Sequence, residues 1–202
     1  MATKQKTRAT YHHGDLRREL IEAAVEMLPE SGMSGLSLRK LAVQAGVSHN
    51  APYMHFSNKD ALLAAIAQYG FQELRARLTE KLQEAWRDRF ISGCQTYVAF
   101  GASQPELFQV MFMEHDAAKF PEMVEDSLAA LQTLTDIIAV GQSEGFVRDG
   151  DAHEFATLVW SLLHGIAVLN ANRQQAPLPY RQEEASEQVA TFLDEILKGL
   201  GV

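Results

Sequence analysis

The stretch GVSHNAPYMHFSNKDALL, from Gly46 to Leu63, holds the most informative pattern in the sequence. It places Pro52 inside a segment that otherwise looks like a short helix, beside an aromatic residue, two histidines and an asparagine. Ser48 is the predicted N-cap of this helix, which ends near Phe56 because a proline beyond the first turn removes a hydrogen bond and clashes with the turn before it. A proline-containing turn between two helices is the alternative interpretation.

Helices are predicted on both sides of this stretch. Before it, apolar residues recur with helical spacing until Pro29 and Gly32 bring a first helix to an end. Ser37 can cap a second helix, which Gly46 stops in a turn. After it, the sequence SNKD at 57–60 has the form of a capping box and begins a long helix.

The rest of the chain is also predicted to be helical. The patterns cover roughly 86–103, 105–115, 122–144, 152–173 and 183–199, with prolines and a glycine turn between them. The sequence therefore predicts an all-α protein. Residues 1–62 are expected to form a three-helix, helix-turn-helix DNA-binding domain, and residues 63–202 a larger helical domain, with no flexible linker between the two.

Composition limits the possible classes of protein. A chain of 202 residues that is 47% hydrophobic can bury a sizeable core. A single cysteine, Cys94, excludes an internal disulfide and any multi-cysteine metal site, which favours a reducing, cytoplasmic location. The longest uninterrupted apolar run is Ala61 to Ala67, so neither secretion nor a membrane span is expected.

The net charge of -8 argues at first against a nucleic-acid partner. The distribution of charge reverses that argument, because residues 1–60 hold eight Lys and Arg against six Asp and Glu, a net charge of +2. The rest of the chain is therefore strongly acidic. Such asymmetry is typical of a basic DNA-reading segment on an acidic body.

Two helices joined by a tight glycine turn form a helix-turn-helix unit, whose second helix lies in the DNA major groove. Val47 and Ala51 can pack against the preceding helix, which leaves His49, Asn50 and Tyr53 pointing outward. An asparagine can form paired hydrogen bonds with adenine, whereas serine, tyrosine and lysine side chains typically bond phosphates. We therefore expect this segment to contact DNA.

The motif L-S-L-R-K-L-A-x-x-A-G-V-S, followed by Y-x-H-F and S-N-K-D-A-L-L, resembles the DNA-binding segment of tetracycline-repressor-like (TetR family) regulators. In that family, residues matching Tyr53, His55 and Lys59 tend to touch DNA. Pro52 departs from the usual Leu or Ile, and Met54 from a frequent aromatic or basic residue, so Met54 either reads a thymine methyl group or packs. The predicted DNA-binding residues are Ser37, Arg39, Ser48, His49, Asn50, Tyr53, His55 and Lys59.

A second likeness lies near the C-terminus. Residues 160–165, WSLLHG, are similar to the Trp-x-x-x-His-Gly helix of one TetR subgroup, of which YHHGDLR near the start is also typical. Trp160 and His164 share a helix face, and Gly165 allows another backbone to approach closely. Two interpretations stay open: the pair packs in a core with the histidine hydrogen-bonded, or it contacts a ligand.

A ligand pocket is expected between the middle helices, where methionines and aromatic residues are frequent. The same side chains would equally suit a helical core. Because no cluster of charges specifies a polar ligand, we expect a small apolar or amphipathic effector and no cofactor. The candidate pocket residues are Phe90, Tyr97, Phe108, Met111, Phe112, Met113, Trp160 and His164.

The helix at 152–173 is apolar nearly all round and must be covered on more than one side. By the resemblance, it forms a homodimer interface with the last helix. Two reading helices about 34–36 Å apart would then match successive major grooves of a palindromic site. The candidate interface residues are Leu162, Ile166, Leu169, Val189, Phe192 and Ile196.

The resemblance implies a ligand-responsive regulator, by default a repressor, and not an enzyme. Two other classes of protein are alternatives. The G-x-S-x-G sequence at 141–145 matches the nucleophile elbow of serine hydrolases, with Ser143 as nucleophile, but that elbow follows a strand and a helix is predicted here. A helical adaptor that binds another protein would share the fold without binding duplex DNA. The seven histidines show no metal-binding spacing.

Overall fold

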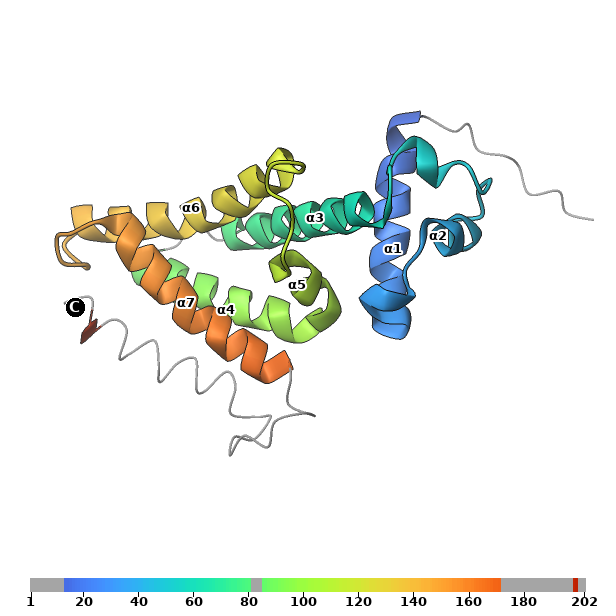
Figure 1. Ribbon diagram of the computed structural model, residues 1–202. Helices are drawn as coiled ribbons and strands as arrows, with labels where there is room; N and C mark the ends of the chain where they lie inside the picture. Colours follow the sequence, from blue (N-terminus) through green and yellow to red (C-terminus); the bar gives the residue numbers. More distant parts are fainter. Residues whose placement is uncertain (1–12, 81–84, 172–197, 200–202) are drawn as a thin grey trace, which may run out of the picture. The chain divides into compact units, whose positions relative to one another are not determined.

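The computed structural model describes residues 13–80, 85–171 and 198–199. In these ranges the secondary structure is entirely helical, which confirms the predicted all-α class. The chain divides into two compact units, Met1–Ile66 and Ala67–Val202. The elements labelled in Figure 1, with the short 3-10 helix η1, are α1 (His13–Gly35), α2 (Leu38–Gln44), η1 (Pro52–Met54), α3 (Lys59–Thr79), α4 (Trp86–Ser103), α5 (Pro105–Phe112), α6 (Pro121–Ser143) and α7 (Ala152–Ala171).

The first unit is built around the apolar face of α1. The helix breaks at Gly32, whose φ of 59° and ψ of 175° are not helical, and one further turn carries it to Gly35. The predicted stop at Gly32 is therefore a kink rather than an end. Fully buried apolar side chains from α1, α2, the segment after η1 and the start of α3 form the core, among them Leu20, Leu28, Leu41, Phe56, Leu62 and Ile66.

The turn after α2 has the hydrogen bonds of a Schellman motif. Gly46 takes a φ of 65°, the Val47 N–H donates to the Ala42 carbonyl at 3.0 Å, and the Gly46 N–H donates to the Val43 carbonyl at 3.1 Å. At the other end of α2, the Ser37 side chain accepts from the Lys40 N–H at 3.2 Å. Both predicted ends of this helix are confirmed.

The third helix is not a regular α-helix. The chain from Ser48 forms turns and then η1, in which successive N–H groups donate to carbonyls three residues back, such as Tyr53 to Asn50 and Met54 to Ala51, each at 3.1 Å. Pro52 has no N–H to donate to Ser48 four residues back, so the tighter 3-10 pattern replaces the α pattern. The predicted cap at Ser48 is therefore wrong, and the proline-containing turn describes the segment better.

The long helix α3 contains the boundary between the two units. It is capped by Asn58, whose side-chain oxygen accepts from the Ala61 N–H at 2.9 Å. Its first residues belong to the first unit, and the residues from Ala67 onward belong to the second. One continuous helix therefore supplies side chains to both cores.

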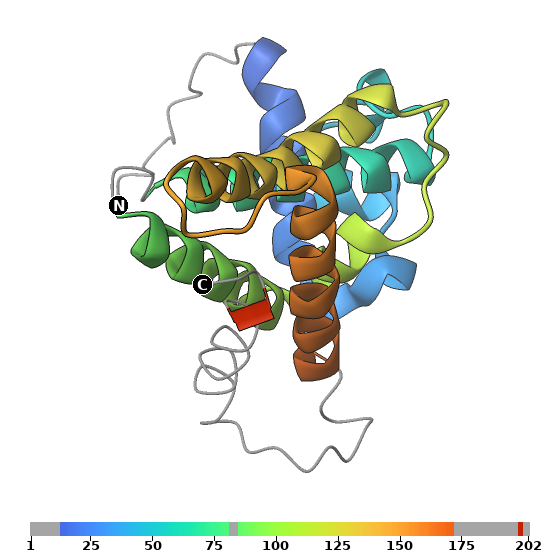
Figure 2. The ribbon, with the colours of Figure 1, turned by 90° about the vertical axis from the view of Figure 1, so that its left-hand side faces the viewer.

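The second unit is a bundle in which α7 packs on α4 and α6, and α4 also packs on α5 and α6 (Figure 2). The helix predicted at 105–115 is shorter than expected, since α5 ends at Phe112. Trp86 at the start of α4 lies against Gly141 of α6, and its indole N–H donates to the Ile137 carbonyl at 2.7 Å. Nearly all of the predicted last helix, 183–199, lies outside the described residues.

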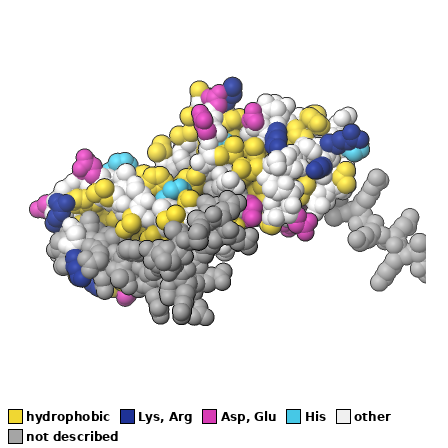
Figure 3. Space-filling view, turned by 60° about the horizontal axis from the view of Figure 1, so that its bottom comes forward, with side chains coloured by type: hydrophobic (Ala, Val, Ile, Leu, Met, Phe, Trp, Pro, Cys, Tyr) yellow, Lys and Arg dark blue, Asp and Glu magenta, His cyan; other side chains and the backbone are white. Residues whose placement is uncertain are grey.

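Helix α7 leaves part of its apolar surface uncovered by the described chain. By length and composition alone, Ala152–Asn170 could cross a membrane, although its contacts with α4 and α6 are those of a helix in a bundle. Leu158 is 67% exposed and Leu169 is 49% exposed. Hydrophobic side chains are also spread over the face of this unit seen in Figure 3.

Candidate DNA-binding surface and ligand cavity

The predicted DNA-binding residues lie together around α2 and η1 in the first unit. The side chains of Arg39, Ser48, His49 and Asn50 are exposed, and Tyr53 is 55% exposed. Pro52 and Phe56 are buried beneath them and hold the segment in place. The segment thus presents its polar residues outward, although in turns and a 3-10 helix rather than in an α-helix.

Three of the predicted DNA-binding residues are partly buried or form hydrogen bonds within the protein. Ser37 caps α2, and His55 is half-buried. The Lys59 Nζ donates to the Ser34 carbonyl at 3.2 Å, and the Lys40 Nζ donates to the Gly35 carbonyl at 2.9 Å. Two ammonium groups therefore lie at the C-terminal end of α1, where positive charge is favourable to the helix dipole.

Two apolar side chains stand on the same surface. Met54 is 83% exposed and Val43 is 69% exposed. An exposed methionine has little packing role, so of the two uses predicted for Met54, packing is excluded within the described chain.

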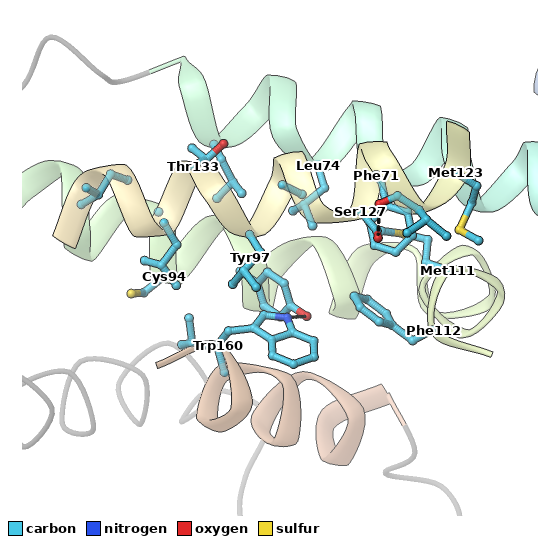
Figure 4. Close-up of a pocket in the computed structure, with 18 of the residues that line it drawn as sticks. Phe71, Leu74, Cys94, Tyr97, Met111, Phe112, Met123, Ser127, Thr133 and Trp160 are labelled. Carbon is cyan, nitrogen blue, oxygen red and sulfur yellow. Dashed lines mark hydrogen bonds between the residues drawn. The ribbon is translucent and has the colours of Figure 1, made fainter. Parts of the chain in front are cut away.

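A cavity of about 370 Å³ lies inside the second unit (Figure 4). Its volume is near the lower end of the range for small-molecule sites. Helices α3 to α7 and the loop after α5 all contribute to its wall. The lining is mainly apolar and aromatic, and no Asp, Glu, Lys or Arg is found in its described part.

Most of the predicted pocket residues line this cavity. Those that do are Phe90, Tyr97, Met111, Phe112, Met113 and Trp160. Phe108 and His164 are not in the lining but lie one layer behind it, with the His164 ring stacked on the Phe108 ring at a centroid distance of 5.3 Å. The prediction therefore located the side of the cavity formed by α4, α5 and α7.

Sequence reasoning missed the side formed by α3 and α6. Phe71, Leu74 and Leu78 from α3 line the cavity, as do Ser127 and Thr133 from α6. Their only signal in the sequence is a place on the apolar stripe of each helix, which is the same for a core residue and for a cavity residue.

A hydrogen-bonded group joins α4 to α7 at the cavity wall. The Trp160 Nε1–H donates to the Tyr97 hydroxyl at 3.0 Å, and that hydroxyl lies 2.9 Å from His164 Nδ1. Because an indole can only donate, the Tyr97 oxygen accepts from Trp160. We assign to His164 the neutral tautomer with its hydrogen on Nε2, in which Nδ1 accepts from the Tyr97 hydroxyl.

Burial shifts the titration of both partners. It raises the pKa of Tyr97, and the Trp160 hydrogen bond opposes this rise only partly. It lowers the pKa of His164, which favours the neutral ring that can accept from Tyr97. The interpretation of Trp160 and His164 as a packed pair with a hydrogen-bonded histidine fits this geometry, while Trp160 also reaches the cavity.

The three described interface candidates lie on α7. Leu162 is 39% exposed, Leu169 is 49% exposed and Ile166 is half-buried. A side chain at Gly165 would meet no other atom within 4 Å, so no backbone of the described chain approaches it closely. The other three candidates, Val189, Phe192 and Ile196, lie outside the described residues.

The G-x-S-x-G sequence lies at the end of a helix. Helix α6 runs to Ser143, whose hydroxyl donates to the Val140 carbonyl at 2.8 Å, and Gly145 follows with a φ of 78°. The helix end explains Gly145, and the close approach of Trp86 explains Gly141. The serine lacks the preceding strand that a nucleophile elbow requires.

Comparisons with known proteins match both units. Residues 20–66 match the family described as bacterial regulatory proteins, tetR family, and residues 90–193 match the tetracyclin repressor-like C-terminal domain. A solved structure of a protein of unknown function from Rhodococcus sp. RHA1 is 36% identical, with a TM-score of 0.82 over 96% of this chain and 100% of that chain.

Two curated relatives are transcriptional regulators. An uncharacterized HTH-type transcriptional regulator of Bacillus subtilis, YobS, is 26% identical over 93% of both chains. The class A tetracycline repressor protein of Escherichia coli is 37% identical over 78 residues, which are 39% of this chain and 36% of that one. The chain therefore belongs to the TetR family, whose members are DNA-binding, ligand-responsive transcriptional regulators and not enzymes.

Proposed function

We propose that this protein is a homodimeric repressor that binds a palindromic operator and is released by a small molecule in the second unit. One observation carries the proposal: α3 contributes both to the core beneath the DNA-reading segment and to the wall of the cavity. A ligand that changes the position of α3 in the second unit thereby acts on the helix that begins at Lys59. The proposed division of labour is DNA binding by residues 1–62 and regulation by residues 63–202.

The proposed DNA contacts fall into two groups. Asn50 and His49, both exposed, are assigned to base edges, because side chains in the major groove read sequence by hydrogen bonds. Ser37, Arg39, Ser48, Tyr53, His55 and Lys59 are assigned to the phosphate backbone, where hydroxyl and cationic groups set the register.

The proposed effector occupies the cavity and is apolar or amphipathic. Phe90, Tyr97, Met111, Phe112 and Trp160 support this assignment because they line the cavity with aromatic and sulfur-bearing side chains. Phe108 and His164 are assigned a supporting role behind the wall. We further propose that the chain belongs to the TetR subgroup with a Trp-x-x-x-His-Gly helix, on the basis of Trp160, His164 and Gly165.

The proposed dimer forms through α7 and the last helix. The exposed leucines of α7 support this assignment, because a contiguous apolar surface on a water-soluble domain favours association. Leu162, Ile166 and Leu169 are assigned to the interface together with Val189, Phe192 and Ile196. A cytoplasmic location is proposed, since the target is DNA.

The mechanism we propose is a shift of population. The unliganded dimer holds its two reading segments at the operator spacing, and the effector binds better to another arrangement. The effector can move the equilibrium only by its difference in affinity for the two states, so DNA and effector must weaken each other's binding equally.

The experiment that tests the proposal selects duplexes from a random pool with the purified protein in low-salt buffer. A palindromic consensus, bound less tightly as salt increases, is the expected result. A metabolite screen by melting temperature then identifies ligands, because a ligand that binds the native state raises its stability. If no duplex is selected, the protein is not a DNA-binding repressor and the adaptor interpretation gains support.

A further inference from the structure

The cavity has few polar side chains, so the hydrogen-bond partner of each can be considered in turn. In the described lining they are His115, Tyr97, Ser127, Thr133, Trp160 and the thiol of Cys94. None is an acid, a lysine or an arginine, so the cavity has no fixed charge of either sign in this part. What the wall can offer a ligand therefore depends on which hydrogens and lone pairs remain unused.

On the α4 and α7 side, both polar hydrogens are already donated within the protein. The Trp160 N–H donates to Tyr97 at 3.0 Å, and the Tyr97 hydroxyl lies 2.9 Å from His164 Nδ1 and donates to it. A phenolic oxygen has two lone pairs, and the indole uses one of them. What Tyr97 keeps for a ligand is an acceptor site.

On α6 and in the loop after α5, the polar side chains of the lining also donate their hydrogens within the protein. The Ser127 hydroxyl donates to the Val124 carbonyl at 2.7 Å, and the Thr133 hydroxyl donates to the Ala129 carbonyl at 3.2 Å. His115 Nε2 lies 2.8 Å from the Val110 carbonyl, which can only accept, so this nitrogen carries the hydrogen. The hydroxyl oxygens of Ser127 and Thr133 remain as acceptors.

Among the tyrosine, tryptophan, serine, threonine and cysteine side chains of the described lining, only the Cys94 thiol keeps a hydrogen of its own to offer, and a thiol is a weak donor. The aromatic walls act in the same sense, because a ring presents its negative face to what lies over it and attracts a positive edge or a cation. A carboxylate or phosphate in this cavity would lose its water and gain few side-chain donors in return, which is costly.

We propose that the effector is an apolar molecule whose polar group donates hydrogen bonds, a hydroxyl or an amine N–H, and is not an anion. This inference rests on the proposed function, in which the cavity is the effector site. Tyr97 and Ser127, from α4 and α6, are the assigned acceptors; both oxygens are drawn in Figure 4.

A matched series of ligands on one apolar body tests the proposal. The probes are 4-phenylphenol, 4-phenylbenzylamine, 4-methoxybiphenyl and biphenyl-4-carboxylate, and dissociation constants for the full chain are measured by titration calorimetry. The phenol or the amine should bind about tenfold more tightly than the methyl ether, the difference expected for one hydrogen bond donated to a buried acceptor. The carboxylate should bind most weakly. Comparing the dissociation constants of the phenol and the amine shows whether the cavity prefers a neutral or a cationic donor.

Two variants make the assignment specific. Tyr97→Phe removes the assigned acceptor and leaves the Trp160 N–H without its partner, so the methyl ether, whose oxygen can accept from that N–H, should bind more tightly than it binds the parent protein. Ser127→Ala removes an acceptor without leaving a donor unpaired, so it should reduce the preference for the phenol in a protein of nearly unchanged stability. Ser161→Ala is the control, since this exposed hydroxyl on α7 donates to the Thr157 carbonyl and lies outside the lining.

The proposal would be overturned if the ether or the carboxylate bound the parent protein as tightly as the phenol and the amine, or more tightly. It would also be overturned if no probe bound. Duplex selection with the same preparation separates this failure from that of the proposed function. If an operator is still selected, only the chemistry assigned to the effector is wrong. If no operator is selected, the regulator itself is in question, whatever the ligand series gives.

Discussion

The Tyr97 hydroxyl lies 2.9 Å from His164 Nδ1 and joins α4 to α7 behind the cavity. Protonation of His164 would place a hydrogen on this nitrogen and leave Tyr97 with no acceptor there. Burial also favours the neutral ring, because it lowers the pKa of His164 below its ordinary value of 6.5. The pair is therefore most stable when the imidazole is neutral.

The free energy of unfolding should fall as the pH decreases below the ordinary pKa of histidine. Below about pH 6.5 the unfolded chain binds a proton at His164 that the folded chain resists, so the free energy of unfolding declines until the lowered pKa is reached. Urea unfolding between pH 5 and pH 8 measures the slope. His164→Gln should flatten part of it, whereas the exposed His153→Gln should not. An unchanged slope in His164→Gln would remove His164 from this role.

Replacing Asn50 should relax sequence preference. With Asn50→Ala we expect a loss of about 1–3 kcal/mol of discrimination at one operator base pair, because the paired bonds to adenine disappear. The measurement compares the affinity for the selected operator with that for operators changed at single positions. Gln109→Ala, an exposed amide on α5, is the control. Unaltered discrimination in Asn50→Ala would show that this residue does not read a base.

Lys59→Ala should weaken binding to every duplex and reduce the salt slope by about one, since a phosphate contact carries no sequence information. The alternative role for Lys59 is its bond to the Ser34 carbonyl at the end of α1. Lys40→Ala is the matched comparison, because Lys40 bonds the neighbouring Gly35 carbonyl. If Lys59→Ala and Lys40→Ala lower only the melting temperature and leave the slope intact, Lys59 stabilises the helix end and does not bind DNA.

A charge on the exposed face of α7 should break the dimer. Leu162→Glu would bury a carboxylate in the proposed interface, and we expect a monomer by light scattering together with much weaker operator binding. Leu128→Glu introduces the same charge at a leucine of α6 that is 59% exposed, and should leave the mass unchanged. A dimeric Leu162→Glu protein would place the interface elsewhere.

The contact between Trp86 and Gly141 should tolerate no added methyl group. A Cβ at Gly141 would lie 2.4 Å from Cε2 of the indole, which its hydrogen bond to Ile137 holds in place. Gly141→Ala should therefore cost about 1–3 kcal/mol in urea unfolding. Gly165→Ala, with open space around it, should instead gain about 0.5–1 kcal/mol. A loss of dimer stability in Gly165→Ala would indicate that a second chain approaches there.

Much of the fold could be predicted because its signals are local. The end of α2 at Gly46 needs a positive φ, and its start needs a side chain such as Ser37 that can accept a hydrogen bond. The 3-10 form of Pro52–Met54 was harder to predict, since a proline disfavours an α-helix but does not determine which other conformation the chain adopts. Asn58 rather than Ser57 caps α3, and such one-residue choices depend on the path of the preceding loop.

The cavity was only half predictable for a different reason. Tyr97 could be predicted because aromatic residues suit an apolar wall, and Trp160 because it belongs to a motif similar to that of a TetR subgroup. Leu74 and Ser127 gave no such signal, because whether a small or aliphatic side chain faces a cavity or a core depends on the distance between helices. That distance is set by contacts such as Gly70 against Met111, which belong to different helices.

The buried thiol of Cys94 has a practical consequence. It is the only sulfhydryl in the sequence, it lies in the cavity wall with 1% of its surface exposed, and burial raises its pKa. Alkylation of the unmodified protein by a maleimide can thus occur at one position alone, and slowly. The rate of that reaction would report occupancy of the interior, with no engineered label, for any compound that shields the sulfur.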